Sequence, residues 1–242
     1  MLEKTKAIVL NKIKYTDSSI IVNLLSLKYG RTSIMVKACR NKKSDVKANI
    51  FFPLNIIETD IYYKQNRNIQ LLKNAAPIYA LNDISTDIYK TCIAQFLVEI
   101  IQKSIKEETQ NTDVFNFIEN AVIILEKSNK PINNFHVIFL IHLAKLLGFK
   151  ITNNYCKQTP FFNIREGMFL PLFTNEEESL NGNESIYLSN LLNIKIEDFY
   201  ITDVPYKKRI IILETLTRYY RQHILNDSEI NSFAVLYEIF DK

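Results

Sequence analysis

The stretch SSIIVNLLSLKYGRTSIMVKA (residues 18–38) decides the fold class of the first part of this chain. Its first ten residues form an apolar run rich in β-branched side chains, which is typical of a strand. Tyr29 and Gly30 then predict a tight turn, because glycine adopts positive φ at no steric cost. Beyond the turn, apolar and polar side chains alternate, which predicts a second strand with Ile34 and Val36 on its buried face.

Three more strand patterns surround this hairpin: residues 5–17 before it, and residues 50–65 and 69–78 after it. Five strands in about 80 residues, with meander-like connections, predict a small closed β-barrel, because closure removes exposed sheet edges. An SH3-like barrel is the nearest alternative on strand number. At the end of the first run the lysines are expected to point out and the apolar side chains in, at Lys12, Ile13, Lys14 and Tyr15.

From Leu81 onward the apolar period changes to that of helices. One helix is expected over 83–108, with Asp83 or Ser85 as its cap. Residues 150–182 contain prolines, glycines and many asparagines, and are expected to be irregular. The fold class is therefore α+β, with a barrel domain at 1–80 and a helical domain at 81–242. The remaining helices are expected over 112–128, 133–148, 206–225 and 229–240.

Composition excludes several classes of protein. With 47% hydrophobic and 23% charged residues, the chain resembles a globular protein. Its three cysteines, Cys39, Cys92 and Cys156, are far apart, which suits a reducing cytoplasm rather than a disulfide framework. No secretory signal and no apolar run of membrane-spanning length is visible, so we expect a cytoplasmic protein without a membrane partner.

The sequence also lacks the common patterns of catalytic and cofactor sites. It has 4 glycines, where an average chain of this length has about 17, and no two are spaced for a phosphate-binding loop. The pattern GxSxG is absent, and no pair of carboxylates stands out from ordinary helix-surface charges. We therefore expect a protein that is not an enzyme and that needs no cofactor or metal.

Charge is distributed unevenly along the chain. Residues 1–80 hold 14 Lys/Arg against 5 Asp/Glu, a net charge of +9, whereas residues 81–242 carry −5. A basic strand-rich module with several tyrosines suits a nucleic-acid strand, because lysine and arginine neutralise phosphates and aromatic rings stack on bases. The alternative is a solvated basic face with tyrosines in the core. The predicted phosphate-binding residues are Lys12, Lys14, Arg31, Lys37, Arg40, Lys42, Lys43, Lys47, Lys64 and Arg67. The predicted base-stacking residues are Tyr15, Tyr29, Tyr62 and Tyr63.

A second basic cluster lies on the predicted helix at 206–225. A solvated helix face is the simpler explanation of this cluster. The functional alternative is a groove for an acidic peptide with an apolar end, because the cluster precedes and interleaves with an apolar stripe. The members of the cluster are Lys207, Lys208, Arg209, Arg218 and Arg221.

Several segments in this order resemble the bacterial RecO family of recombination mediators. They are residues 5–44, ending in the basic run KACRNKK (37–43), then 52–75, HLAKLLGF (142–149) and 218–233. The resemblance covers nearly the whole chain. It implies an OB-fold barrel followed by a helical domain.

One departure from the family concerns zinc. Many members carry two CxxC pairs after the LLGF helix that bind zinc, whereas here only Cys156 remains and Thr159 stands where the second cysteine would fall. One thiolate cannot build a tetrahedral structural site. We therefore expect an irregular segment without zinc, held by packing of Phe161, Phe162, Met168 and Phe169.

The resemblance implies binding of single- and double-stranded DNA, annealing of complementary strands and work with RecR. It also implies help in loading RecA onto DNA covered by single-strand-binding protein, whose acidic C-terminal tail the family binds, and association with the nucleoid during repair. The residues EINSF (229–233) depart from the family's usual K-S-R pattern. Two alternatives remain: an RNA-binding OB-fold protein, and a protein-interaction scaffold that does not bind DNA.

Overall fold

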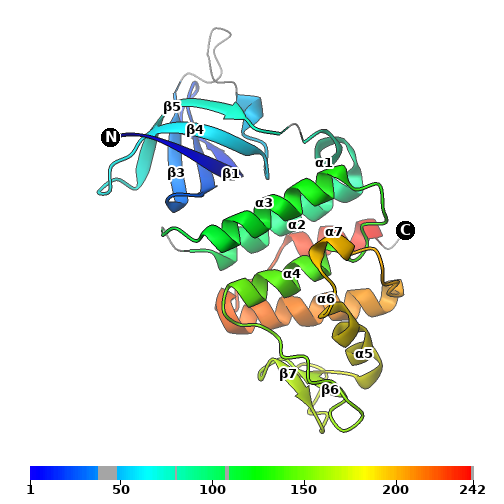
Figure 1. Cartoon of the computed structure of the whole chain (residues 1–242). Helices are drawn as coiled ribbons and strands as arrows, with labels where there is room; N and C mark the ends of the chain where they lie inside the picture. Colours follow the sequence, from blue (N-terminus) through cyan, green and yellow to red (C-terminus); the bar gives the residue numbers. More distant parts are fainter. Residues whose placement is uncertain (38–47, 80, 107–108, 241–242) are drawn as a thin grey trace. The chain divides into compact units, whose positions relative to one another are not determined.

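The structure is a computed structural model that describes residues 1–37, 48–79, 81–106 and 109–240 (Figure 1). The chain divides into two compact units, residues 1–122 and 123–242. The first unit holds a closed β-barrel together with two helices and most of a third. The second holds the rest of the helices and a small sheet. The expected domain boundary at residue 80 stays a prediction.

The barrel has the five expected strands, in the order β1-β2-β3-β5-β4. The meander-like connectivity was wrong in one respect, because β3 pairs in parallel with β5 and not with β4. The chain therefore crosses from one side of the barrel to the other between β3 and β4, as in the Greek-key OB-fold. The strands are β1 (Leu2–Lys14), β2 (Ile20–Ser26), β3 (Gly30–Val36), β4 (Ile56–Tyr62) and β5 (Ile69–Pro77).

Strand β1 buries side chains on both of its faces. Ala7 and Val9 belong to the barrel core, as do Ile34 and Val36 from the predicted alternation. Ile8 points the other way and is also fully buried, in a row with Leu25 and Ile56. Helix α2 (Ile88–Ser104) contacts β1, so part of the barrel's outside is covered within the first unit.

The expected orientation at the end of β1 was wrong. Ile13 and Tyr15 are 54% and 58% exposed, and Lys12 and Lys14 are exposed as well. A bulge between Val9 and Asn11 shifts the register, and such a shift moves side chains to the other face of a strand.

The other helices follow the predicted pattern closely, and one helix within 182–205 was not predicted. They are α1 (Asn82–Thr86), α3 (Thr112–Lys127), α4 (Phe135–Leu146), α5 (Gly182–Leu191), α6 (Tyr206–Tyr220) and α7 (Ser232–Phe240). Short helical turns are η1 (Ala48–Ile50), η2 (Ile196–Asp198) and the π-helical η3 (Arg221–Leu225). Across the described residues, no helix is both long and apolar enough to cross a membrane.

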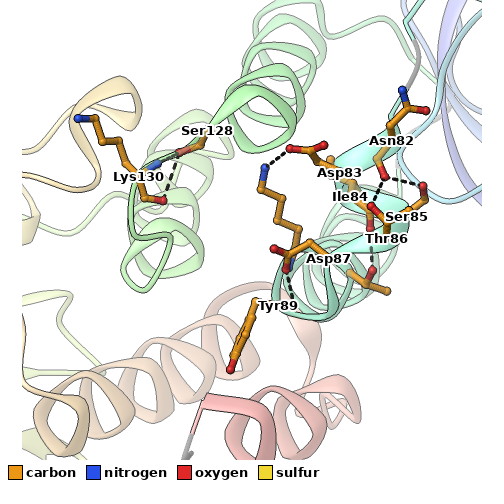
Figure 2. Close-up of polar contacts among 11 residues, drawn as sticks. Asn82, Asp83, Ile84, Ser85, Thr86, Asp87, Tyr89, Ser128 and Lys130 are labelled. Atoms are coloured by element: carbon orange, nitrogen blue, oxygen red, sulfur yellow. Dashed lines mark hydrogen bonds and ion pairs between the residues drawn. The ribbon is translucent and has the colours of Figure 1, made fainter.

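The helix expected over 83–108 is broken at Asp87, which separates α1 from α2. The Asp87 carboxylate accepts hydrogen bonds from the amides of Tyr89 and Lys90, at 2.8 and 3.0 Å (Figure 2). Asp87 is therefore the cap of α2, in place of the predicted Asp83 or Ser85. Asp83 instead pairs with the Lys90 ammonium at 3.0 Å.

The segment 150–182, expected to be irregular, contains a small three-stranded sheet in the order β7-β6-β8. Its strands are β6 (Phe161–Asn163), β7 (Met168–Leu170) and β8 (Ser179–Leu180). Phe162 and Phe169 are fully buried with ring centroids 5.5 Å apart. The expected aromatic packing is thus confirmed for these two residues, while Phe161 and Met168 are only partly buried.

Replacing Asp87 with alanine removes the acceptor for two amides at the start of α2. We expect the free energy of unfolding to fall by about 1 kcal/mol, the usual cost of losing a helix cap. Urea denaturation followed by circular dichroism measures this loss. Asp87→Asn keeps an acceptor and should retain most of the stability, so an equal loss in both variants would contradict the capping role.

His136 on α4 is 2% exposed, and burial, followed by the nearby Arg209, lowers its pKa from 6.5 to about 3. Between these values the unfolded chain binds a proton that the folded chain does not, so stability falls as the pH drops below about 6.5. We expect His136 to account for about 2 kcal/mol of lost stability between pH 7 and pH 5. Urea denaturation of the wild type and His136→Leu at both pH values isolates this share, and equal pH dependence in the two proteins would refute it.

Candidate nucleic-acid interface

A polar ladder crosses the outer face of strands β1, β2 and β3. Asn23 donates to Asn11 Oδ1 at 2.6 Å, and Ser33 donates to Asn23 Oδ1 at 2.7 Å. The three residues share one row of the sheet, and each is only partly buried. This row presents neutral donors and acceptors and no charge to a ligand.

A second row on the same face, two residues away along each strand, is apolar. Ile13 lies opposite Ile21, which lies opposite Met35, and Met35 is followed by Leu71 of β5. Tyr62 of β4, which is 43% exposed, extends this row beyond Leu71. A neutral ladder beside an apolar row on a barrel wall suits the sugars and base faces of a single strand.

Exposed basic side chains lie at the ends of the strands that form this face. Lys14 shares a row with the core residues Ile20 and Val36, so it extends from the core-facing side of β1 at the end of the barrel, and Lys37 directly follows β3. Lys14 pairs with Asp17 at 3.0 Å, but an exposed pair of this kind adds little stability and leaves the ammonium open to phosphate.

Two more basic residues, Lys64 and Arg67, sit on the hairpin between β4 and β5. This hairpin folds around the buried side chain of Gln70, which accepts from the Lys64 amide and donates to the carbonyls of Lys64 and Arg67. Gln70 shares a row with Ile34, Val22 and finally Lys12. Val22 and Ile34 belong to the barrel core, so Gln70 points into the barrel while the basic hairpin that it holds lies at the ends of β4 and β5.

Arg31 differs from the other predicted phosphate ligands. Its guanidinium donates to the backbone carbonyls of Gln102 and Ile105, at 2.7 and 3.2 Å. These carbonyls close the C-terminal end of α2, where a positive charge is favourable. Arg31 therefore ties the barrel to α2. Lys6 likewise ties the barrel to α3 by pairing with Glu119 at 2.7 Å.

The four predicted stacking tyrosines fall into two pairs. Tyr15 and Tyr62 are 58% and 43% exposed and can offer ring faces to bases. Tyr29 and Tyr63 stack on each other, with ring centroids 3.8 Å apart. Burial, followed by the Glu3 carboxylate, raises the pKa of Tyr29. In this second pair, each tyrosine ring covers one face of the other ring.

Four of the predicted phosphate ligands lie outside the described residues: Arg40, Lys42, Lys43 and Lys47. Their contribution to the interface stays a prediction from the sequence.

The predicted peptide-docking residues are separated by the fold of the second unit. Lys208 pairs with Glu184, and Arg209 is buried and donates to the Val204 carbonyl at 3.0 Å. Lys207 is exposed at the start of α6.

Arg218 and Arg221, in contrast, share a pocket of about 410 Å³ with Ile230 and Phe233. Arg218 is held by the carbonyls of Glu176 and Glu177. The Arg221 Nε atom is buried and has no hydrogen-bond partner among the described residues. A buried guanidinium nitrogen beside apolar side chains suits a carboxylate with an apolar neighbour. Glu214 and Glu229 also line the pocket and oppose a large negative charge there.

The segment 150–182 holds a single cysteine. Cys156 is exposed, and its Sγ lies 3.1 Å from Thr159 Oγ1. A structural zinc ion needs four ligands, and the described part of the chain holds no cluster of three His, Cys, Asp or Glu side chains that could bind a metal.

Sequence reasoning missed the polar ladder and the apolar half of the pocket. Asn23 interrupts an otherwise apolar strand run, and that interruption could have signalled an outward polar row. Ile230 and Phe233 could have been noticed as apolar residues next to the basic cluster. Some basic side chains bind helix ends or carboxylates and are not available to a ligand. The sequence does not show which ones, because their partners are distant in the chain.

Comparison with known proteins identifies the family. The family model for the recombination protein O N-terminal domain matches residues 1–81, and that for the C-terminal domain matches residues 85–229. The DNA repair protein RecO of Flavobacterium psychrophilum is 34% identical over 98% of both chains. The DNA repair protein RecO of Azobacteroides pseudotrichonymphae is 30% identical over the full length of both. With these matches, the OB-like barrel and the helical region that follows it, the chain belongs to the RecO family of DNA repair proteins.

Proposed function

We propose that this protein is a recombination mediator without catalytic activity. It binds single- and double-stranded DNA, anneals complementary strands and, with RecR, helps to load RecA onto DNA covered by single-strand-binding protein. It acts in the cytoplasm, at the nucleoid during repair. The observation that carries this proposal is the outer face of the barrel, where a neutral ladder and an apolar row lie on strands whose ends carry exposed basic residues.

The ends of those strands supply the attraction to DNA. Lys12, Lys14 and Lys37 lie toward one end of the sheet rows, and Lys64 and Arg67 lie on the β4–β5 hairpin. Each cation that neutralises a phosphate releases a counterion, which favours binding without regard to sequence. Arg31 is left out of this surface, because its guanidinium is committed to the end of α2.

The same surface accounts for annealing. Two complementary strands repel each other through their phosphates, and a positive surface lowers that repulsion. The ladder of Asn11, Asn23 and Ser33 adds contacts to the bound strand. All three side chains are neutral, so no charged group binds the bases. Bases bound in this way remain able to pair with a second strand.

The pocket beside Arg218 and Arg221 supports binding of an acidic tail with an apolar end. Its Ile230 and Phe233 provide the apolar contact, and the Arg221 Nε atom provides a donor for the carboxylate. The π-helical turn η3 begins at Arg221 and is followed by two residues with positive φ, Asn226 and Asp227. Such turns occur often at functional sites.

Replacing three exposed cations of the barrel should weaken DNA binding and its salt dependence together. Each neutralised phosphate contributes about 0.7 to the salt slope for single strands, so the triple variant should have a slope smaller by about 2. Salt-titrated fluorescence anisotropy with single-stranded DNA measures it, and a strand-annealing assay should slow in parallel. The changes are Lys37→Ala, Lys64→Ala and Arg67→Ala.

The matched control removes three exposed lysines from outside the barrel: Lys127, Lys157 and Lys195. An identical slope in both triple variants would contradict a phosphate-binding role for the barrel. Titration of RNA of equal length tests the RNA-binding alternative, which a strong preference for RNA would favour.

Arg221→Met should weaken binding of an acidic peptide that ends in an apolar residue and a free carboxylate. A hydrogen bond to a charged group contributes about 1.5–3 kcal/mol, so we expect at least a tenfold rise in the dissociation constant. Anisotropy of a labelled peptide measures it, with Lys207→Ala as the control outside the pocket. Unchanged affinity in Arg221→Met would place the tail elsewhere.

A further inference from the structure

A separate pocket of about 370 Å³ lies on the first unit and has no assigned role. It is lined by the end of η1, the turn that leads into β4, the segment after β5 and helix α1. Its volume falls in the range of pockets that bind small ligands, about 300–1,000 Å³. None of the strand rows or basic residues of the candidate interface contributes to its described lining.

The lining combines aromatic rings with neutral amides. Phe52 and Tyr79 are 40% and 39% exposed, and three asparagines, Asn49, Asn55 and Asn82, stand around them. Among the described residues of the lining, none is charged. Such a pocket suits a neutral planar ring with polar edges, because rings stack on its faces and amides pair with its donors and acceptors.

One wall of this pocket is held in a strained backbone conformation. The Asn55 amide donates to the Phe52 carbonyl at 3.0 Å and closes a tight turn in which Leu54 has φ 65°. That region normally favours glycine, and Leu54 tolerates it while fully buried and bonded through its amide to Val9. Strain of this kind persists where the surroundings enforce it and is found at binding sites.

One of the three side-chain amides, that of Asn55, is oriented by a hydrogen bond to the backbone. Asn55 donates through Nδ2 to the Ile50 carbonyl at 2.9 Å, which leaves its Oδ1 as an acceptor. The Asn82 carbonyl accepts from Ser85 and Thr86 at 2.7 and 2.9 Å, and its side-chain amide points away from these bonds (Figure 2). The pocket therefore offers at least one acceptor, Asn55 Oδ1, that the fold holds in place.

We propose that this pocket binds one unstacked nucleobase of a single strand, an inference that rests on the proposed function. An amide can both donate and accept, so its partners can adapt to different base edges and the pocket can tolerate any sequence. The pocket belongs to the same compact unit as the barrel that carries the exposed cations Lys37, Lys64 and Arg67.

The experiment compares two probes with the full-length protein at one salt concentration. One is a thymidine oligonucleotide and the other an abasic oligonucleotide with the same number of phosphates. The wild type should bind the base-bearing probe about tenfold more tightly, given the usual effect of one stacked base. The double variant Phe52→Leu, Tyr79→Leu should lose most of this preference and keep its affinity for the abasic probe.

The control is Tyr89→Leu, which removes a tyrosine of similar exposure, 43%, that does not line the pocket. It should keep the full preference. A double variant that also keeps the full preference overturns the base pocket. A wild type that binds both probes equally overturns it too and leaves the proposed function standing, whereas a wild type that binds neither overturns the proposed function itself.

A strand with photoreactive 5-iodouracil gives an independent readout. Crosslinks to Phe52 or Tyr79 support the pocket. Crosslinks confined to the outward tyrosines Tyr15 and Tyr62 contradict it, because a base held in the pocket must lie against the two lining rings.

Discussion

Closure of the barrel depends on a parallel pairing of only three residues on each strand, Ser33–Met35 of β3 with Ile69–Leu71 of β5. Without it both strands would present unpaired edges. The pairing is reinforced by Gln70, a buried amide whose side chain makes three hydrogen bonds to the backbone of the β4–β5 hairpin. One neutral residue thus fixes both the closure and the position of the basic hairpin.

That closure also separates two uses of positive charge. Cations on the open side of the barrel, such as Lys37 and Lys64, remain exposed. Cations that face the helices of the first unit instead make intramolecular contacts. Lys6 pairs with Glu119, and Arg31 binds the end of α2. A net charge counted along the sequence therefore overstates the charge that a ligand meets.

The sequence predicted the elements of the fold much better than the site. Period-two and helical patterns are local, so the five strands and most helices could be read directly, including the turn at Gly30, whose φ is 62°. The pairing of β3 with β5 and the bulge in β1 could not, because both depend on partners far along the chain. For the same reason Arg31 was indistinguishable in sequence from an exposed phosphate ligand, and the stacking of Tyr29 on Tyr63 was invisible.

The buried outer row of Ile8, Leu25 and Ile56 bears on how far the barrel is a module. These side chains do not serve the barrel core, and α2 lies against β1. A fragment cut near residue 80 would expose them to water and leave the Arg31 guanidinium without its carbonyls. The two family models meet near residues 81–85. Cutting the chain at this boundary is thus expected to destabilise the barrel.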